Sequence, residues 1–386
     1  MSAPSLERLE TLSSRFVPDL VVDELCAELF ASLPRSDQRR KGEVYLRGLL
    51  KAEGRKSIRN IAAHVGDRAA EQSLHHFVVS STWDWGPVRA ALARYLERAM
   101  RPRAWVVQPV VISKAGTESV GVARRFVPER GQMVNSQVAF GVWSVGEEQS
   151  CPVNWRLALT QKWRDSVGPL SPNVHESELA TSPLECAAGA VEELRDWVGQ
   201  SRRPVVFDLP DVDPAAVAGR FGPAGMHFVA SARGSMRVRC VDPVLPSSGS
   251  RELAAHQLLL MARTLRRPVT WLDPVTLQPR TTLVVGVRVE LPQAPRPLLL
   301  FGEWSDPRGW PEQCWISNMT QAPPGGLLRL AKRAQNVEAD FANISQKVGL
   351  TDFGGRSFGG WHRHTTLASA AHAVRMLTQR AVERQV

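Results

Sequence analysis

The sequence has no stretch approaching the roughly 20 uninterrupted apolar residues that a membrane span requires, and its polar N-terminus carries no apolar signal core. These absences predict a cytoplasmic protein without membrane contact. The five cysteines are far apart and form no CxxC pair, which argues against both a disulfide framework and a zinc knuckle. We interpret them as reduced, mostly buried thiols.

Lysine is also scarce, since only seven of the 48 basic residues are lysines and the rest are arginines. A GC-rich coding sequence would explain arginine over lysine, but not the formal net charge of +10 or the pI of 9.9. A positive balance attracts polyanions, and the arginine fork binds phosphate well. With 43% hydrophobic residues, the composition predicts a globular protein that binds nucleic acid.

Residues 1–103 show helical periodicity and predict an N-terminal helical, DNA-binding domain. Helices are expected at LERLETLSSRF, VVDELCAELFASL, VYLRGLLKAEG and VRAALARYLERAM. Two basic clusters lie between the helices: Arg39, Arg40 and Lys41, then Arg55, Lys56 and Arg59. Ser57 can cap the helix that carries the apolar face Ile58, Ile61, Ala62 and Val65. The clusters fit either a helix-turn-helix-like DNA contact or an ordinary solvated helix face.

The middle of the chain has the residue pattern of β-strands. Within 104–234 we expect strands at WVVQPVVI, ESVGVARRFV and NSQVAFGVWSV, followed by a helix, a strand that ends at Asp208, a short helix and a last strand. This order is that of a ribonuclease-H-like core. Residues 235–318 predict a β-rich insertion, and 319–386 a helical part that completes the core. The fold class is therefore α+β or α/β.

A ribonuclease-H-like core performs phosphoryl transfer with carboxylates that hold divalent metals. The fourth strand offers Asp208 and the late helix offers Glu338, with Asp340 near it. The first strand, in contrast, carries Gln108-Pro109. A proline is a poor residue for continuing a strand, so we expect an interruption there, and an amide is a much weaker Mg²⁺ ligand than a carboxylate.

From about Leu46 to Met376 the chain resembles insertion-sequence transposases of the DDE superfamily, in the branch with a β-rich insertion before the glutamate. The motifs that carry the resemblance are YLRGLL, LHHFVVSSTWDWGPVR, KAGTESVGVARRF, NSQVAFGV, CPVNWRLAL, WISNM, LLRLAK, KVGL and GRSFGGWHRHTTLASAAHA. The resemblance implies a metal-dependent site in which Asp208 and Glu338 match the second and third acids.

The departures from the family pattern concentrate at that site. Gln108 and Pro109 stand where the family has aspartates, and Val110-Val111 replaces its Thr-Gly pair. On the late helix the family's flanking arginines fall on Ala334 and Asn336, and its lysine on Ser345. Two acids of three remain, so the catalytic set is Asp208 and Glu338, residual and inactive, with Gln108 in place of the aspartate. We expect no metal and no cofactor.

Three hypotheses follow. The favoured one is a domesticated transposase-like protein, not an enzyme, that binds double-stranded DNA as a nucleoid-associated regulator and can form a homodimer. Besides the two clusters, its DNA-binding residues would be Lys332, Arg333, Arg356 and Arg363. The second is an active transposase that uses Mg²⁺ with Asp211 or Asp340 as the reassigned ligand.

The third hypothesis is a fold recruited as an interaction scaffold or for small-molecule chemistry, with Val110, Val111 and Ala334 lining the old cleft. A metal pair at His362 and His364 is conceivable, but the sequence places no third ligand there. The resemblance implies a structural or DNA-facing segment at these two histidines.

Overall fold

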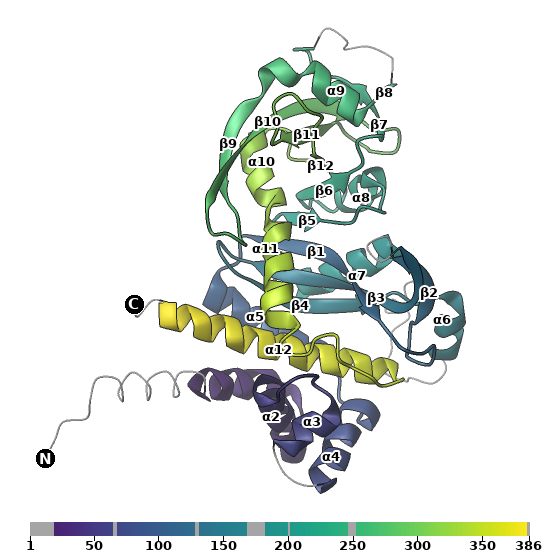
Figure 1. Cartoon of the computed structure of the whole chain (residues 1–386), viewed down its shortest axis with the longest axis vertical. Coiled ribbons are helices and arrows are strands. Elements are labelled where there is room, and N and C mark those ends of the chain that lie inside the picture. The colour runs from purple at the N-terminus through teal and green to yellow at the C-terminus, as the bar shows by residue number, and fades with distance from the viewer. Residues whose placement is uncertain are drawn as a thin grey trace, which may run out of the picture.

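A computed structural model describes residues 19–64, 68–127, 131–167, 182–199, 201–245 and 252–383. Figure 1 shows a large sheet above a long helix, with the N-terminal helices below that helix. The helix expected at LERLETLSSRF falls mostly within residues 1–18 and so lies outside the described residues. No helix of the described part is long and apolar enough to cross a membrane.

The N-terminal part is helical, as the periodicity predicts. Residues 19–29 are helical, and the elements that follow are η1 (Phe30–Ser32), α2 (Ser36–Lys51), α3 (Ile58–Ala63), α4 (Arg68–His75), η2 (His76–Ser80) and α5 (Trp85–Met100). The Ser57 side chain accepts a hydrogen bond from the Asn60 backbone, which confirms the predicted cap of α3. Ile61 and Ala62 are buried, while Val65 lies outside the described residues.

The core is a mixed sheet. Its strands are β1 (Ala104–Ser113), β2 (Ala123–Val127), β3 (Gln132–Val145), β4 (Ser150–Leu157), β5 (Val205–Phe207) and β6 (Phe228–Ala232). β3 pairs antiparallel with β1, β2 and β4, whereas β5 runs parallel to both β1 and β6. Helices α7 (Pro183–Trp197) and α8 (Pro214–Phe221) connect these later strands, and α6 (Gln161–Val167) follows β4.

This mixed α/β arrangement is consistent with a ribonuclease-H-like fold. The structure differs from the sequence prediction first in that most of CPVNWRLAL forms a strand, β4. The segment ESVGVARRFV supplies only the short strand β2. β4 is buried along its whole length, so it carries no alternation of polar and apolar residues to mark it as a strand.

The expected interruption at Gln108-Pro109 is wrong, because β1 is one continuous strand that pairs with β3 over its whole length. The backbone groups of Trp105 and Val107 bond toward β5, and residues two apart along a strand bond to the same side. The missing N–H of Pro109 therefore faces the β5 side. β5 pairs with β1 only as far as Val107, so no ladder hydrogen bond is lost.

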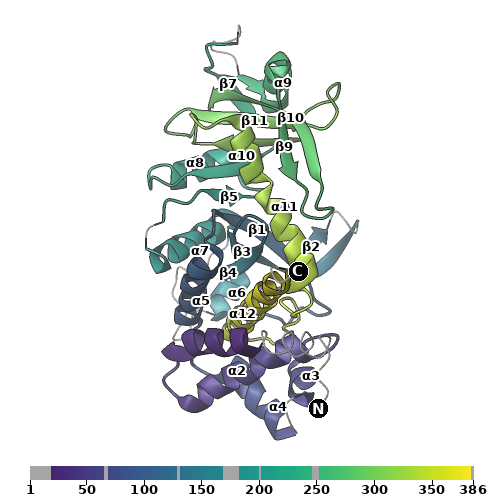
Figure 2. The same cartoon turned by 90° about the vertical axis from the view of Figure 1, so that its left-hand side faces the viewer.

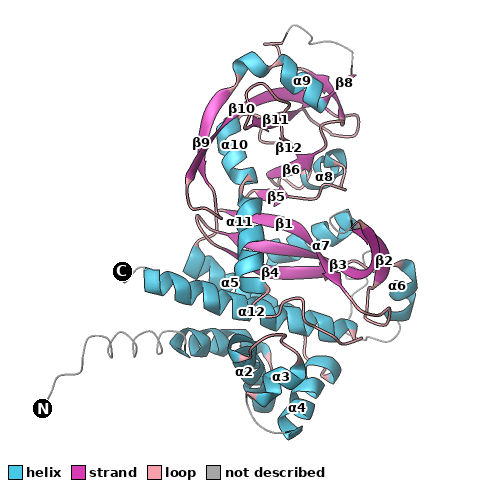
Figure 3. Ribbon diagram, in the orientation of Figure 1, coloured by secondary structure: helices cyan, strands magenta, loops and turns pink. Residues whose placement is uncertain are grey.

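The predicted insertion extends the same sheet rather than forming a separate layer (Figure 3). Its elements are β7 (Arg237–Cys240), β8 (Glu252–Ala254), α9 (Ala255–Met261), η6 (Arg263–Leu265), β9 (Arg267–Leu272), β10 (Pro279–Glu290), β11 (Leu298–Trp304) and β12 (Gln313–Ser317). β12 pairs antiparallel with β6 and joins the insertion to the core. Two strands of the insertion were not predicted: β8 has only three residues, and β9 begins with an arginine and a proline.

The C-terminal part returns to helices: α10 (Pro324–Ala331), α11 (Arg333–Asp340), the π-turn η7 (Phe341–Ser345) and α12 (Phe358–Glu383). Figures 1 and 2 both place α12 between the sheet and the helices α2, α3 and α4. It contacts β4 on one side and α2 on the other. Nearly every residue from Phe358 to Met376 is buried, so α12 is the helix that joins the two parts of the protein.

Candidate functional site

The structure brings together the three residues that the sequence assigned to the catalytic site. Gln108 lies on β1, Asp208 directly follows β5, and Glu338 lies on α11. The Nε2 of Gln108 lies 2.9 Å from Oδ2 of Asp208 and 3.0 Å from the carbonyl oxygen of Ala334. Asp208, Ala334 and Glu338 line a cleft of about 300 Å³. Neither Val110 nor Val111, expected in an apolar version of this cleft, lines it.

The orientation of the Gln108 amide follows from its partners. The Ala334 carbonyl can only accept a hydrogen bond, and so can an ionised Asp208 carboxylate. The amino group of Gln108 must therefore face both of them and donate to both. Gln108 is 7% exposed, so this arrangement is held in a largely buried environment. One N–H donor thus faces Asp208 from the first strand, and the other N–H of the same amide faces Ala334.

Two of the acids that line this cleft, Asp208 and Glu338, have raised pKa values. Burial raises the pKa of Asp208, and the hydrogen bond from Gln108 opposes that rise. The pKa of Glu338 is also raised, first by burial of its carboxyl against the cleft wall and then by the charge of Asp208. Glu338 as a whole remains exposed, so we give its burial less weight than that of Asp208.

The donor set does not fit a two-metal centre. Mg²⁺ needs oxygen ligands at close range, but Gln108 presents N–H hydrogens where the third carboxylate would stand. The candidate replacements are engaged elsewhere. Asp211 is exposed and pairs with Arg233 at 2.7 Å. Asp340 accepts hydrogen bonds from the backbone and hydroxyl of Ser150 at 2.6 and 2.7 Å. Within the described ranges, no three His, Cys, Asp or Glu side chains gather at a possible metal site.

Two of the predicted DNA contacts beside this cleft are structural instead. Lys332 is 8% exposed, pairs with the buried Glu303 at 2.6 Å, and lies 4.5 Å above the Trp271 ring. Arg333 is half-buried, and its guanidinium donates to the backbone carbonyls of Gly146 and Glu147 in the turn between β3 and β4. Both cations bind partners inside the protein, so we no longer assign them to the DNA-binding surface.

The side chains of two further predicted contacts are also buried. Lys56 is 5% exposed, and its amine donates to the carbonyl of Ala52. Arg363 is 6% exposed and donates to the carbonyls of Trp83 and Val78 at 3.0 and 3.1 Å. Burial lowers the pKa of Arg363 to about 10. The sequence shows a cation at these positions, but only the fold shows whether the cation reaches solvent.

The remaining predicted cations stay accessible: Arg39, Arg40, Arg55, Arg59 and Arg356 are exposed, and Lys41 is half-buried. Lys41 pairs with Asp37 at 3.2 Å, and Arg39 donates to the carbonyl of Leu33. The structure places Arg55 against Gly354, two residues from Arg356. The N-terminal helices and the chain before α12 therefore meet at a basic surface.

Sequence reasoning missed a third member of that surface, Lys114. Its amine donates to the carbonyl of Phe353 at 2.7 Å. Burial lowers the pKa of Lys114 to about 8, and the charge of Arg55 adds to that effect. We call Arg55, Lys114 and Arg356 the basic cluster. Lys114 stands in a motif that was treated as scaffold, so no sequence signal separated it from its neighbours.

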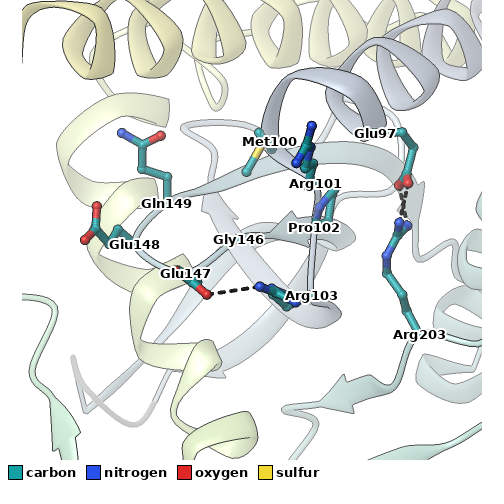
Figure 4. A pocket seen from close by; sticks show the side chains of 10 residues that line it. All are labelled: Glu97, Met100, Arg101, Pro102, Arg103, Gly146, Glu147, Glu148, Gln149 and Arg203. Atoms are coloured by element: carbon teal, nitrogen blue, oxygen red, sulfur yellow. Dashed lines mark hydrogen bonds and ion pairs between the residues drawn. The ribbon is translucent and has the colours of Figure 1, made fainter. Parts of the chain in front are cut away.

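A second depression, of about 630 Å³, lies between the end of α5 and the turn that joins β3 and β4 (Figure 4). Its charged side chains neutralise one another, because Arg103 pairs with Glu147 and Arg203 pairs with Glu97. None of the residues that line it belongs to the predicted site. We assign it no role in the chemistry.

The histidines of α12 are part of the core and not a metal pair. His364 is 1% exposed; its Nε2 donates to the Gly349 carbonyl at 2.8 Å, so its Nδ1 accepts from the Tyr45 hydroxyl at 2.9 Å. His362 is fully buried and stacks on Trp85 with ring centroids 4.7 Å apart. Burial lowers the pKa of both imidazoles, that of His364 to about 4. Both histidines are therefore neutral at pH 7.

Arg89 on α5 organises the same region, and sequence reasoning missed it. It is 2% exposed, and its guanidinium donates to groups of Asn154, Trp155, His362, Thr365 and Thr366 at 2.7 to 3.1 Å. These partners lie on β4 and α12. One arginine therefore ties the N-terminal helices to both the sheet and the C-terminal helix.

A family model described as DDE superfamily endonuclease matches residues 28–289 of the chain. The match covers well over half of the sequence, so the chain belongs to the DDE superfamily of endonucleases. It includes Gln108 and Asp208 but ends before Glu338. A search of curated sequences found no matching protein.

Proposed function

We propose that this DDE-superfamily protein binds double-stranded DNA without cleaving it and acts as a regulator at particular DNA sites, such as a promoter or a relic terminal repeat. The observation that carries the proposal is the hydrogen bond from the Gln108 amide to Asp208, with its companion to Ala334. An endonuclease of this class needs a cation at that position, and this chain places two N–H donors there.

The physical argument is electrostatic. Metal-assisted phosphoryl transfer depends on charge stabilisation by ions held between carboxylates. Losing one carboxylate weakens the attraction for the cation, and the raised pKa values of Asp208 and Glu338 act in the same direction. The loss of several kcal/mol of barrier lowering corresponds to orders of magnitude in rate. The fold needed to hold DNA is unaffected by that loss.

The basic cluster and the exposed Arg39, Arg40 and Arg59 supply the proposed DNA surface. Contacts with phosphates release counterions, so affinity should fall steeply with salt. Binding should be measured by fluorescence anisotropy on duplex DNA over a range of salt concentrations. We expect Arg55→Glu combined with Arg59→Glu to lower affinity at least tenfold and to flatten the salt dependence.

The matched control exchanges two exposed arginines of the insertion, Arg263→Glu with Arg308→Glu. It makes the same change in net charge at a distance from the proposed surface. Equal losses in the two double variants would mean that only the net charge matters, and would remove the proposed surface. Chromatin immunoprecipitation in the host then tests regulation, because a regulator gives a few sharp peaks upstream of genes.

The cleavage half of the proposal is tested on supercoiled DNA and on the element's own terminal repeats with Mg²⁺ and with Mn²⁺. We expect no more nicking than in a control preparation without catalytic activity. Metal-dependent nicking that disappears in Asp208→Ala would establish the alternative, an active transposase. The geometry disfavours that alternative, because Asp211 and Asp340 are held by Arg233 and Ser150.

The other alternative is a scaffold or small-molecule protein that uses the old cleft. That cleft carries Asp208, Glu338 and Lys332 on its walls and is not an apolar pocket. Light scattering of the free protein and of its DNA complex will show whether the proposed DNA-bound form is a homodimer.

A further inference from the structure

A third cleft lies between the core and the insertion, away from the N-terminal helices. It has a volume of about 940 Å³ and is formed where β6 and α8 meet the β10–β11 connection and the end of β12. Figure 1 shows α8 and β6 directly beside the insertion strands at this place. The volume falls within the range of pockets that hold small organic ligands.

The charge of this cleft is of one sign. His227, Arg288 and Arg296 line it, and among the residues that the structure describes no Asp or Glu does. The cleft at Asp208 and Glu338 and the depression in Figure 4 each have three carboxylates on their walls. A cleft with uncompensated arginines and no carboxylate is suited to an anion.

The two arginines are available to a ligand. The side chain of Arg288 makes one long hydrogen bond, 3.4 Å to Oε1 of Gln321, and no described carboxylate pairs with it. Asp242, which lies beside the Arg288 backbone, is occupied, because its carboxylate accepts from the backbone N–H groups of Arg288 and Val244. Arg296 is exposed and bonds to no residue in the described part of the chain. Other arginines of the insertion behave differently: Arg239 and Arg280 are paired with Glu290 and Asp273.

The loop that carries Arg296 is stiff. Arg296 stands between Pro295 and Pro297. Each proline ring fixes its own φ, and Pro297 also restricts the residue before it to extended conformations. A guanidinium on a stiff loop loses less entropy when it binds than one on a flexible loop. The prolines, with Pro223 on the opposite wall, add apolar surface beside the cations, and the amide of Gln321 adds a polar group.

We propose that this cleft binds a small organic phosphate of the nucleoside phosphate class, with the phosphates on Arg288 and Arg296 and the organic part against the prolines. This goes beyond DNA binding and does not depend on it. Because the cleft spans core and insertion, an occupant would fix β6 and α8 relative to β10 and β11. The ligand would therefore act as an effector that stabilises the folded protein.

The test is calorimetric titration of the full chain with ADP, GDP, CDP and UDP, with inorganic phosphate, and with adenosine, all at one ionic strength. We expect one nucleotide or more to bind at a single site, inorganic phosphate to bind at least tenfold more weakly, and adenosine not to bind. Bound nucleotide should also raise Tm, because a ligand of the native state stabilises it. Absence of nucleotide binding, or equal affinity for phosphate alone, overturns the proposal.

Variants separate this cleft from general attraction to a basic protein. Arg288→Gln with Arg296→Gln should lower nucleotide affinity at least tenfold. Arg263→Gln with Arg308→Gln removes the same charge from exposed positions outside the cleft and should leave it unchanged. Arg296→Gln alone, at an exposed loop position, guards against misfolding and should lower affinity by itself.

Equal losses in the two pairs would overturn the proposal. So would a loss of DNA affinity in the cleft pair without a loss of nucleotide affinity, because the cleft would then be a DNA contact.

Discussion

Two polar clusters in this protein have opposite characters. The cleft at Gln108, Asp208 and Glu338 holds two acids of raised pKa and an amide in place of a third acid. The cluster around Arg89 and the histidines of α12 is buried and densely hydrogen-bonded. Both contain residues of the motifs that resemble transposases. The difference fits the proposal that this chain kept the polar groups that hold the fold and lost those that served the reaction.

The largest effect is expected in the second cluster. Arg89→Leu leaves several buried acceptors of β4 and α12 without their donor, and an unsatisfied buried polar group costs about 1–3 kcal/mol. We expect a loss of about 4 kcal/mol or more in the free energy of unfolding, measured by urea denaturation. The exposed Arg94→Leu on the same helix is the control. Similar stabilities for the two variants would mean that Arg89 does not join the parts of the fold.

The next effect is a pH dependence that comes from α12. The pKa of His364 is about 4 in the folded protein against an ordinary 6.5. Between these values the unfolded chain binds a proton that the folded chain does not, so stability falls as pH drops from about 6.5 to 4. One such group accounts for about 3 kcal/mol. His364→Gln, which can keep one donor and one acceptor, should lose less stability over this range.

Protonation of Asp340 has the opposite effect on stability, so its contribution must be measured separately from that of His364. Its pKa is raised to about 6 from an ordinary 3.8, so the folded protein binds the extra proton and acidification through that range adds stability. Asp340→Asn should therefore steepen the loss on acidification. Parallel pH profiles for His364→Gln and the unchanged protein would contradict the assignment of a neutral, buried imidazole.

A smaller effect is expected at the cleft, and it tests whether the lost chemistry can be restored. Gln108→Asp puts a third acid beside Asp208 and should destabilise the metal-free protein by about 2 kcal/mol, because like charges are buried together. Added Mn²⁺ should raise Tm in this variant and leave the unchanged protein and Gln108→Asn as they are. A Mn²⁺ response of the unchanged protein would show that Gln108 does not block the metal.

The smallest effect is expected where the family's arginine falls on Asn336. Asn336 is half-buried at the edge of a cleft, so Asn336→Arg should change the free energy of unfolding by no more than about 0.5 kcal/mol. The same change at the buried Ala334 should cost several times more. A large loss at Asn336 would show that this part of α11 is as tightly packed as the α12 cluster, and would weaken the contrast between the two regions.

Much of the organisation could be predicted from the sequence. Helical periodicity predicted the N-terminal helices, and runs rich in aliphatic and aromatic residues predicted β3, β10, β11 and β12. The cap at Ser57 and the convergence of Gln108, Asp208 and Glu338 were also predicted, the latter through the family resemblance. The strands β4, β8 and β9 were not predicted, because their sequences show no regular alternation of polar and apolar residues that would distinguish a strand from a loop or a buried segment.

The sequence by itself determined the chemical groups of this protein: a surplus of arginine, a glutamine in place of an acid, and the family to which the chain belongs. Only the tertiary structure decided what each group does. Lys56, Lys332 and Arg363 carry the same charge as Arg55 and Arg356, but packing buries the first three and leaves the others in water. The reason is that charge is a property of a residue, whereas desolvation depends on neighbours that the fold brings from distant parts of the chain.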